Sequence, residues 1–377
     1  MSPSRFLFAL SLSMALAWPA AADWPAFRGP SGTGLAADAL PAELAAAWTF
    51  ETGEGIEATA AIAGDTVYVG SLDGYLYALE LGTGKLRFKL KAGGEIKSSP
   101  AVAEGRVYFG DESGLFHAVE AASGKELWSF KAEGPVTSSP AWVPAAKGGE
   151  ARILIGSYDG SLYCLRPTDG KLLWKLETES YVHATPAVAG GMAYLAGCDG
   201  FFRVVRLADG KELAKLPLGG YAAASPALAG KRAFLGTFEN EVLALDLEPL
   251  KIAWRYHDPA NEFPFYASAA LAGGKVVVAG RDRRVQALDA GTGKKLWSFD
   301  TPARVDASPV VAGDRVVAGS KSGELYLLSL ATGEKLWQFS NGTGFAASPA
   351  VAGGFLVIGG LEGRVYAFRG ATKGTSR

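Results

Sequence analysis

Cysteine, histidine and net charge are all scarce in this sequence. Its 377 residues include only two cysteines, Cys164 and Cys198, and three histidines. A disulfide-built scaffold and a metal site made mainly of these side chains are therefore not expected. The 37 basic and 38 acidic residues leave a formal net charge of −1. This balance argues against nucleic acid or an anionic membrane surface as a partner.

Long apolar runs are also missing after the first residues. Beyond residue 22 no stretch approaches the roughly 18 uninterrupted apolar residues of a membrane-spanning helix, so no transmembrane segment is expected. At the start, Arg5 precedes the apolar run from Phe6 to Ala17, and the small residues Ala20 to Ala22 follow. This pattern predicts a signal peptide over residues 1–22. Because no cysteine stands there to accept a lipid, the sequence predicts a soluble periplasmic or secreted protein.

Glycine and proline are abundant instead, with 49 and 19 residues. Because both residues interrupt longer elements, this composition and the 49% of hydrophobic residues favour many short strands. The chain is also longer than the roughly 250–300 residues that a single hydrophobic core supports. Several domains or an array of repeats is therefore expected.

One unit of about 40 residues recurs eight times along the chain. A clear copy begins at Ser98 and reads SSPAVAEGRVYFGDESGLFHAVEAASGKELWSF. The proline of its S-S-P step, or an alanine in its place, marks the eight copies at Ala60, Pro100, Pro140, Pro186, Pro226, Ala269, Pro309 and Pro349. Four short apolar runs separated by turn pairs such as Asp-Gly predict four antiparallel strands in each copy. Such a unit is typical of a β-propeller blade.

The last copy is incomplete, because the chain ends soon after its third run, Arg364–Phe368. Residues Leu44 to Phe50 match the fourth run of the other copies, so we expect them to supply the missing strand. The predicted fold is all-β: an eight-bladed β-propeller of four-stranded antiparallel blades, closed by an N-terminal strand that completes the last blade. Its segments are an N-terminal cap over residues 23–43, the propeller over residues 44–369 and a tail over residues 370–377.

The copies resemble the blades of the pyrroloquinoline-quinone (PQQ) repeat family, which carry the signature A-x-D-x-x-T-G-K-x-x-W. The fullest match runs from Ala287 to Trp297. In that family the signature tryptophan docks between neighbouring blades. The resemblance assigns this structural role to Trp48, Trp128, Trp174, Trp254, Trp297 and Trp337. Phe88 and Ala214 stand at the same place in two other blades, and we expect weaker junctions there.

A candidate binding rim is predicted where the repeats differ from one another. In the family's topology these positions lie on one face, and recognition concentrates in loops that a rigid scaffold holds. The residues expected at the rim are Glu57, Lys97, Tyr158, His183, Phe238, Tyr266, Arg281, Arg304, Asp306 and Lys321. An acidic sector (Glu57, Glu95, Glu112), a basic sector (Arg281, Arg304, Lys321) and an aromatic arc (Tyr158, Tyr181, Tyr221, Phe238, Phe265, Tyr266) divide it. A solvated rim without a partner explains the polarity of these loops equally well.

Two functional hypotheses follow from the resemblance. The first is a non-enzymatic protein-binding scaffold of the cell envelope, similar to the BamB-like outer-membrane assembly factors, which would act as a monomer and bind an envelope protein or peptide. BamB-like proteins are lipoproteins, and this chain departs from them in lacking the lipid-acceptor cysteine.

The second hypothesis is a small-molecule or PQQ-binding protein of the quinoprotein dehydrogenase type, with PQQ and Ca²⁺ as cofactors. Those enzymes usually carry a disulfide of adjacent cysteines over the cofactor, which Cys164 and Cys198, far apart in the sequence, cannot form. We predict no catalytic residue, no metal ligand and no cofactor, and the scaffold is the favoured hypothesis.

Overall fold

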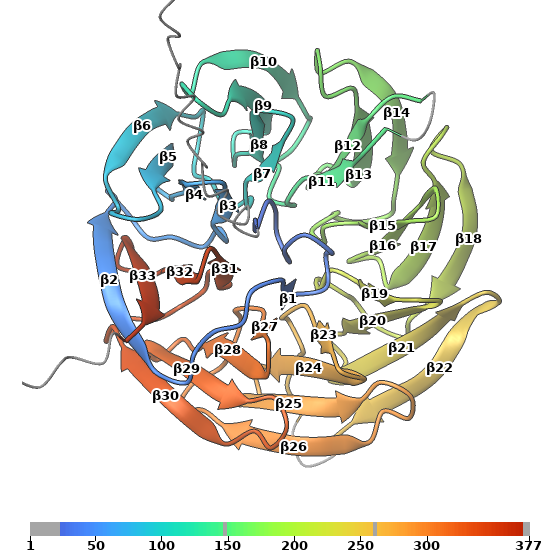
Figure 1. The fold of residues 1–377 in the computed structure, drawn as a ribbon. Coiled ribbons are helices and arrows are strands. Elements are labelled where there is room, and N and C mark those ends of the chain that lie inside the picture. Colours follow the sequence, from blue (N-terminus) through green and yellow to red (C-terminus); the bar gives the residue numbers. More distant parts are fainter. Residues whose placement is uncertain (1–22, 146–148, 259–261, 372–377) are drawn as a thin grey trace, which may run out of the picture.

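The fold is a closed ring of eight antiparallel four-stranded sheets, with an added short strand in one of them (Figure 1). The structure is a computed structural model that describes residues 23–145, 149–258 and 262–371. Across these residues the secondary structure is all β, without a helix, and no segment there could cross a membrane as a helix. The predicted eight-bladed β-propeller is therefore confirmed. The predicted signal peptide (residues 1–22) and most of the tail lie outside the described residues.

Each blade runs outward in chain order from a three-residue inner strand to a longer outer strand. Blades one to four consist of β3 (Ala61–Ala63), β4 (Thr66–Gly70), β5 (Tyr75–Glu80), β6 (Leu86–Lys91); β7 (Ala101–Ala103), β8 (Arg106–Gly110), β9 (Leu115–Glu120), β10 (Glu126–Lys131); β11 (Ala141–Val143), β12 (Arg152–Gly156), β13 (Ser161–Leu165), β14 (Leu172–Glu177); and β15 (Ala187–Ala189), β16 (Met192–Ala196), β17 (Phe201–Arg206), β18 (Glu212–Pro217).

Blades five to seven repeat this order, and blade eight takes its outer strand from the N-terminal part of the chain. They consist of β19 (Ala227–Ala229), β20 (Arg232–Gly236), β21 (Glu241–Leu247), β22 (Leu250–His257); β23 (Ala270–Ala272), β24 (Lys275–Gly280), β25 (Arg284–Asp289), β26 (Lys295–Asp300); β27 (Val310–Ala312), β28 (Arg315–Gly319), β29 (Glu324–Ser329), β30 (Lys335–Ser340); and β31 (Ala350–Ala352), β32 (Phe355–Gly359), β33 (Arg364–Gly370), β2 (Leu44–Glu51).

Ring closure depends on the pairing of β2 with β33. The two strands are antiparallel and stay in register from Leu44 opposite Gly370 to Glu51 opposite Arg364. The expectation that residues 44–50 complete the last blade is confirmed. Because each end strand covers an edge that would otherwise be open, neither end of the array is left unpaired.

The tryptophans of the outer strands lie on the next blade. In five of them the indole N–H donates to a backbone carbonyl of that blade: Trp48 to Leu81, Trp128 to Pro167, Trp174 to Leu207, Trp254 to Ala290 and Trp297 to Leu330, at 2.7–3.1 Å. The indole ring also covers a turn glycine, as Trp48 covers Gly84. That glycine has φ +72° and no room for a Cβ atom, so the turn and the tryptophan fit each other.

Three junctions differ from this arrangement. Phe88 covers Gly124 without a hydrogen bond donor, and Trp337 packs edge-on against Phe368 of blade eight, at 5.3 Å between ring centroids. At the junction of blades four and five, Ala214 faces a blade whose last turn, between β21 and β22, contains no glycine.

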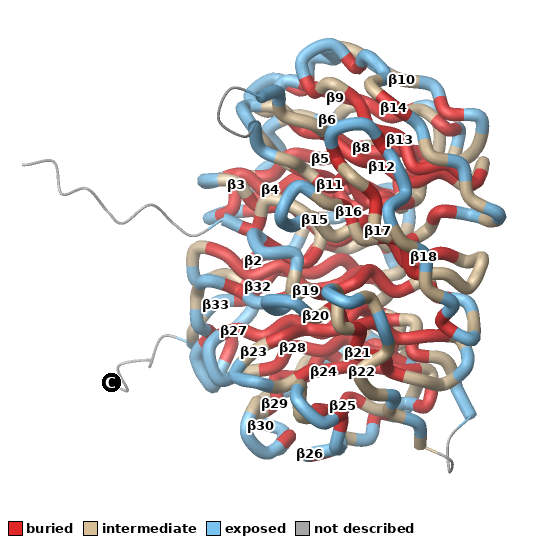
Figure 2. The backbone as a smooth tube through the Cα atoms, turned by 90° about the vertical axis from the view of Figure 1, so that its right-hand side faces the viewer, coloured by how far each residue is buried: buried red, intermediate tan, exposed pale blue. Residues whose placement is uncertain are grey.

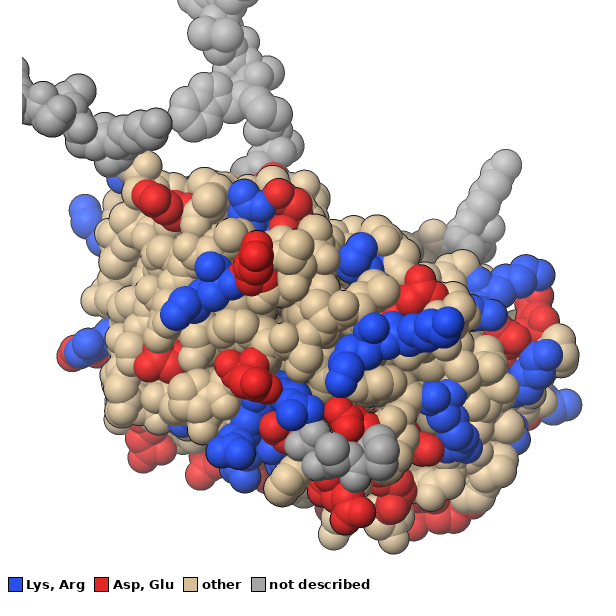
Figure 3. All heavy atoms as spheres, turned by 90° about the horizontal axis from the view of Figure 1, so that it is seen from below, with Lys and Arg blue, Asp and Glu red and all other residues tan. Residues whose placement is uncertain are grey.

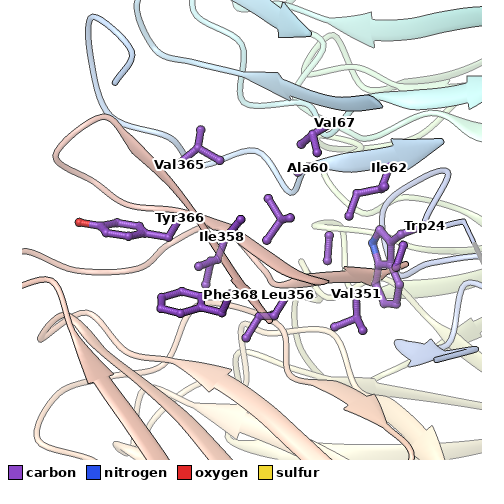
Figure 4. Close-up of a cluster of buried hydrophobic side chains, with 14 of the residues drawn as sticks. Trp24, Ala60, Ile62, Val67, Val351, Leu356, Ile358, Val365, Tyr366 and Phe368 are labelled. Carbon is purple, nitrogen blue, oxygen red and sulfur yellow. The ribbon is translucent and has the colours of Figure 1, made fainter. Parts of the chain in front are cut away.

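The cap, residues 23–43, crosses the centre of the ring beside the inner strands (Figure 1). Trp24 is fully buried and forms an antiparallel bridge with Ile62 of β3. It lies near Val351 of blade eight in the cluster of Figure 4. Farther along, β1 (Leu35–Ala36) pairs in parallel with β27. The cap therefore covers part of the channel on one face of the propeller.

Burial follows the strands, and charge is dispersed over the surface. Buried residues lie mostly in the strands and exposed residues mostly in the loops (Figure 2). Basic and acidic side chains alternate over the side seen in Figure 3, in keeping with the net charge of −1. Specific binding must therefore rest on local features.

Candidate functional site

A belt of hydroxyl groups surrounds the axis and holds the inner strands together. One serine or threonine directly precedes the proline site of each copy: Thr59, Ser99, Ser139, Thr185, Ser225, Ser268, Ser308 and Ser348. The backbone N–H of each of the first seven donates to the hydroxyl oxygen of the next, at 2.9–3.2 Å. This belt gives the rim above it a rigid base.

Above the belt lies a cavity of about 440 Å³, which we call the upper cavity. All the predicted rim residues except Phe238 line it, together with the belt hydroxyls. Phe27 of the cap also lines it and separates it from a second cavity on the opposite face. The channel mouth is therefore a pocket with an aromatic side chain from the cap at its base.

The basic sector is a chain of paired groups. The Asp306 side chain is only 9% exposed and accepts from Nε of Arg281 at 2.9 Å, while its second oxygen lies 3.2 Å from Nε of Arg304. The guanidinium of Arg281 also lies over the ring of Tyr266, 4.8 Å from its centroid. Two cations thus share one carboxylate, and Lys321 nearby adds a third positive charge to this wall.

The acidic sector faces the cavity from blades one and two. Nζ of Lys97 lies 3.3 Å from a carboxylate oxygen of Glu95 and 3.7 Å from one of Glu112. Burial opposes the charge of Lys97, but Glu112 and Glu95 outweigh burial and raise its pKa. Burial raises the pKa of Glu112. With Glu57 beside them, this sector has more acidic than basic groups.

A tyrosine–histidine–tyrosine bridge joins blades three, four and six. The hydroxyl of Tyr158 lies 2.7 Å from Nδ1 of His183, and that of Tyr266 lies 3.0 Å from Nε2. Burial lowers the pKa of His183 and raises that of Tyr266 to about 12, so all three groups are neutral near pH 7. A neutral imidazole donates through one nitrogen and accepts through the other, which fits one bond to each tyrosine.

A further depression of about 370 Å³ lies on the outer side of this bridge, on the same face as the upper cavity, and we call it the aromatic groove. It is lined mainly by aromatic side chains: Tyr158, Tyr181, His183, Tyr221, Phe238 and Tyr266. Tyr181 and Tyr221 are 55% and 59% exposed, and Tyr158 stacks on Tyr181 at 4.8 Å. The structure corrects one member of the predicted aromatic arc. Phe265 is only 4% exposed and belongs to the core of blades five and six.

The rim does not offer the donor set of a PQQ and Ca²⁺ site. Asp306 is already held by two arginines, and among the described residues no group of three or more His, Cys, Asp or Glu could hold a metal ion. Cys164 and Cys198 are both free. The residues present therefore do not fit this pair of cofactors, and we derive no redox step from them.

Sequence reasoning missed the hydroxyl belt and the position of Phe27. The signal for the belt was present, because a serine or threonine stands before the proline site in all eight copies. Phe27 gave no such signal, since nothing in a single cap segment shows how deeply it enters the channel.

The comparisons with known proteins agree with this geometry. The family model described as "Outer membrane protein assembly factor BamB" matches residues 40–151, 112–213, 159–272 and 203–376. No curated protein matches the chain.

Among solved structures, BamB from Moraxella catarrhalis has a TM-score of 0.74 at 15% identity, covering 87% of this chain and 100% of its own. Quinohemoprotein alcohol dehydrogenase from Comamonas testosteroni has a TM-score of 0.79 at 15% identity, covering 94% and 82%. A europium-containing methanol dehydrogenase has a TM-score of 0.78 at 14% identity, covering 92% and 98%. Likeness at this level shows a shared fold, whereas the family model spans nearly the whole chain. The chain belongs to the BamB-like family of PQQ-repeat β-propellers.

Proposed function

We propose that this protein is a non-enzymatic, protein-binding scaffold of the cell envelope that binds a segment of an envelope protein at its rim. The observation that carries the proposal is the aromatic groove. It exposes two tyrosines, Tyr181 and Tyr221, beside a charged pocket. Exposed aromatic side chains surrounded by polar groups are typical of protein interfaces, where tyrosine and arginine contribute much of the binding energy.

The pairing of charges at the rim supports this function. Arg281 and Arg304 are held by Asp306, and Lys97 lies between two glutamates. Groups fixed in this way present a defined pattern of charge, which favours orientation and selection of a partner. The membership in the BamB-like family adds an envelope protein as the class of partner.

The test is site-specific photocrosslinking in envelope preparations, with the photoreactive residue placed at Tyr221. In the double variant Tyr181→Ala/Tyr221→Ala, position 221 is an alanine, so the photoreactive residue replaces Phe238 of the same groove instead. We expect this variant to lose the crosslinked partner. Leu213→Ala is the matched control, because Leu213 is also exposed, at 44%, but lies on the outer strand β18. A partner captured equally by the double variant and the control would refute the assignment of the groove.

The second candidate, a small-molecule-binding protein, is favoured by the volume of the upper cavity. Calorimetric titration with PQQ and Ca²⁺ separates the two functions. Saturable, stoichiometric binding would overturn the scaffold, and a flat titration would leave it as the better account.

A further inference from the structure

The cap covers the inner strands unequally, and this asymmetry leaves part of the lower channel without hydrogen-bond partners. The middle residue of each inner strand forms a non-hydrogen-bonded pair with the second strand, so its N–H and C=O face the axis. In blades one, two, six and seven that N–H donates to a carbonyl of the cap: Ile62 to Trp24, Val102 to Pro25, Leu271 to Thr33 and Val311 to Gly34, at 2.7–3.0 Å.

Blades three, four and five have no such partner. Within the described residues, the backbone N–H groups of Trp142, Val188 and Leu228 form no hydrogen bond. β15 and β19 each contain an exposed residue, whereas none of the capped strands β3, β7, β23 and β27 does. Val351 of blade eight lacks a bond too, but it is only 1% exposed. The open backbone edge is therefore confined to three neighbouring blades.

A cavity of about 560 Å³, which we call the lower cavity, lies over these three strands. Its walls are the cap residues 25–32 and the inner strands, with Pro140, Trp142, Pro186, Val188, Pro226 and Leu228 among the lining residues. Among the described residues, Arg28 is the only charged group that lines it, and its two terminal nitrogens donate to the carbonyls of Pro309 and Ala269, at 2.9 and 2.6 Å. Within the described residues, the cavity thus combines mainly apolar walls with unpaired amide groups, and its one charged side chain, Arg28, is only 3% exposed.

We propose that the lower cavity binds an extended, uncharged peptide segment of a partner protein, which pairs by its backbone with β15. The N–H and C=O of Val188 in the middle of β15 are complementary to the backbone of one residue of an added strand, and addition of a strand is an established mode of peptide recognition. Mainly apolar walls select small or apolar side chains. β15 is the middle strand of the three and ends in the exposed Ala189, so a peptide can enter beside it.

The cap shows that the same surface accepts this kind of chain. Over blades one, two, six and seven a cap carbonyl accepts from the middle N–H of each inner strand, and the two-residue strand β1 pairs in parallel with β27. The proposed site continues that interface around the ring. A three-residue inner strand spans roughly 10 Å at the usual rise of a strand, which sets the paired length at about three residues of the partner.

The test is binding of a panel of terminally blocked hexapeptides made only of Ala, Val, Leu, Ser and Pro. Trp142 lines the cavity, so its fluorescence reports occupancy, and hydrogen exchange of the Val188 amide reports pairing. We expect at least one peptide to bind and to slow that exchange. Its analogue with N-methyl groups on alternate residues should bind at least about tenfold more weakly, because it keeps the side chains but loses the pairing amides.

Three protein variants distinguish loss of peptide binding from misfolding and from loss of binding at the rim. Leu228→Arg puts a charge into the cavity and should abolish peptide binding, whereas Leu213→Arg, on an exposed outer strand, should leave it unchanged. The rim variant Tyr181→Ala/Tyr221→Ala should bind the peptides normally, so failure of one site does not imply failure of the other. Equal binding of the N-methylated analogue would indicate an apolar small-molecule site and overturn the proposal. So would the absence of binding across the panel up to about 1 mM.

Discussion

Replacement of Trp48 tests how strongly the closing strand holds the ring. The Trp48 residue is only 9% exposed, its ring covers Gly84 of the next blade, and its N–H donates to the carbonyl of Leu81 at 2.7 Å. Trp48→Ala removes both contacts and the burial of the indole ring. From the usual cost of a large-to-small change at a buried position, we expect a loss of about 3–5 kcal/mol in the free energy of unfolding.

A second variant divides this loss into two parts. Trp48→Phe keeps a ring over the glycine, as Phe88 of blade one lies over Gly124 of blade two. It leaves the Leu81 carbonyl without its donor. We expect this variant to lose about 1–2 kcal/mol, close to the value of one hydrogen bond with a small change in packing. The exposed Leu86, at 44%, provides the control, since Leu86→Ala should change stability by less than about 0.5 kcal/mol.

The measurement is equilibrium unfolding in urea, followed by far-UV circular dichroism, with the slope against urea as a check that the same surface unfolds. The expected order of stability is wild type, then Trp48→Phe, then Trp48→Ala. A loss below about 1 kcal/mol for Trp48→Ala would refute the reasoning, because no buried indole that anchors a strand should be removed at so small a cost.

Three further predictions concern a turn, a buried acid and the two thiols. Gly333→Ala should destabilise the protein more than Gly354→Ala, as measured by thermal unfolding: both glycines have positive φ, at +78° and +74°, but only at Gly333 would the new Cβ lie 2.6 Å from an indole ring. Burial raises the pKa of Asp282 to about 6, above the value near 3.9 of an unfolded chain, so the stability contributed by this group should be fully present below pH 4 and fall by up to about 3 kcal/mol as pH rises to about 6. Asp282→Asn should remove this fall in urea titrations from pH 4 to 7.5, and an unchanged slope would contradict it. Burial raises the pKa of the Cys164 thiol to about 12 and leaves no part of it exposed, so iodoacetamide followed by mass spectrometry should label the half-buried Cys198 in the native protein and Cys164 only after unfolding.

The fold could be predicted from the sequence because the information for it is repeated eight times. Each copy carries its own turn glycines and apolar runs, and the short last copy, with its match at Leu44 to Phe50, predicts the closure between β2 and β33. Repetition also aligns equivalent positions, so the residues at the mouth could be found by their departure from the repeat. All but Phe238 of the predicted rim line the upper cavity.

What the repeat could not predict is how side chains from different blades meet. The bridge from Tyr158 through His183 to Tyr266 skips blade five, because Ala223 there is too small to reach into the mouth. Phe265 is adjacent in sequence to Tyr266, yet it points into the core, since neighbouring residues in an extended chain face opposite sides. The cap occurs only once, so no comparison between copies could place Phe27 or show which inner strands stay uncovered.

The pairing between β2 and β33 also determines when blade eight can form during synthesis of the chain. β2 is synthesised early, but it pairs with β33, the last strand among the described residues. Until β33 has been synthesised, blade eight cannot form, and the unpaired edges of β2 and β32 invite aggregation. A product truncated before Arg364 should therefore be more sensitive to proteases, because it lacks the strand that pairs with β2.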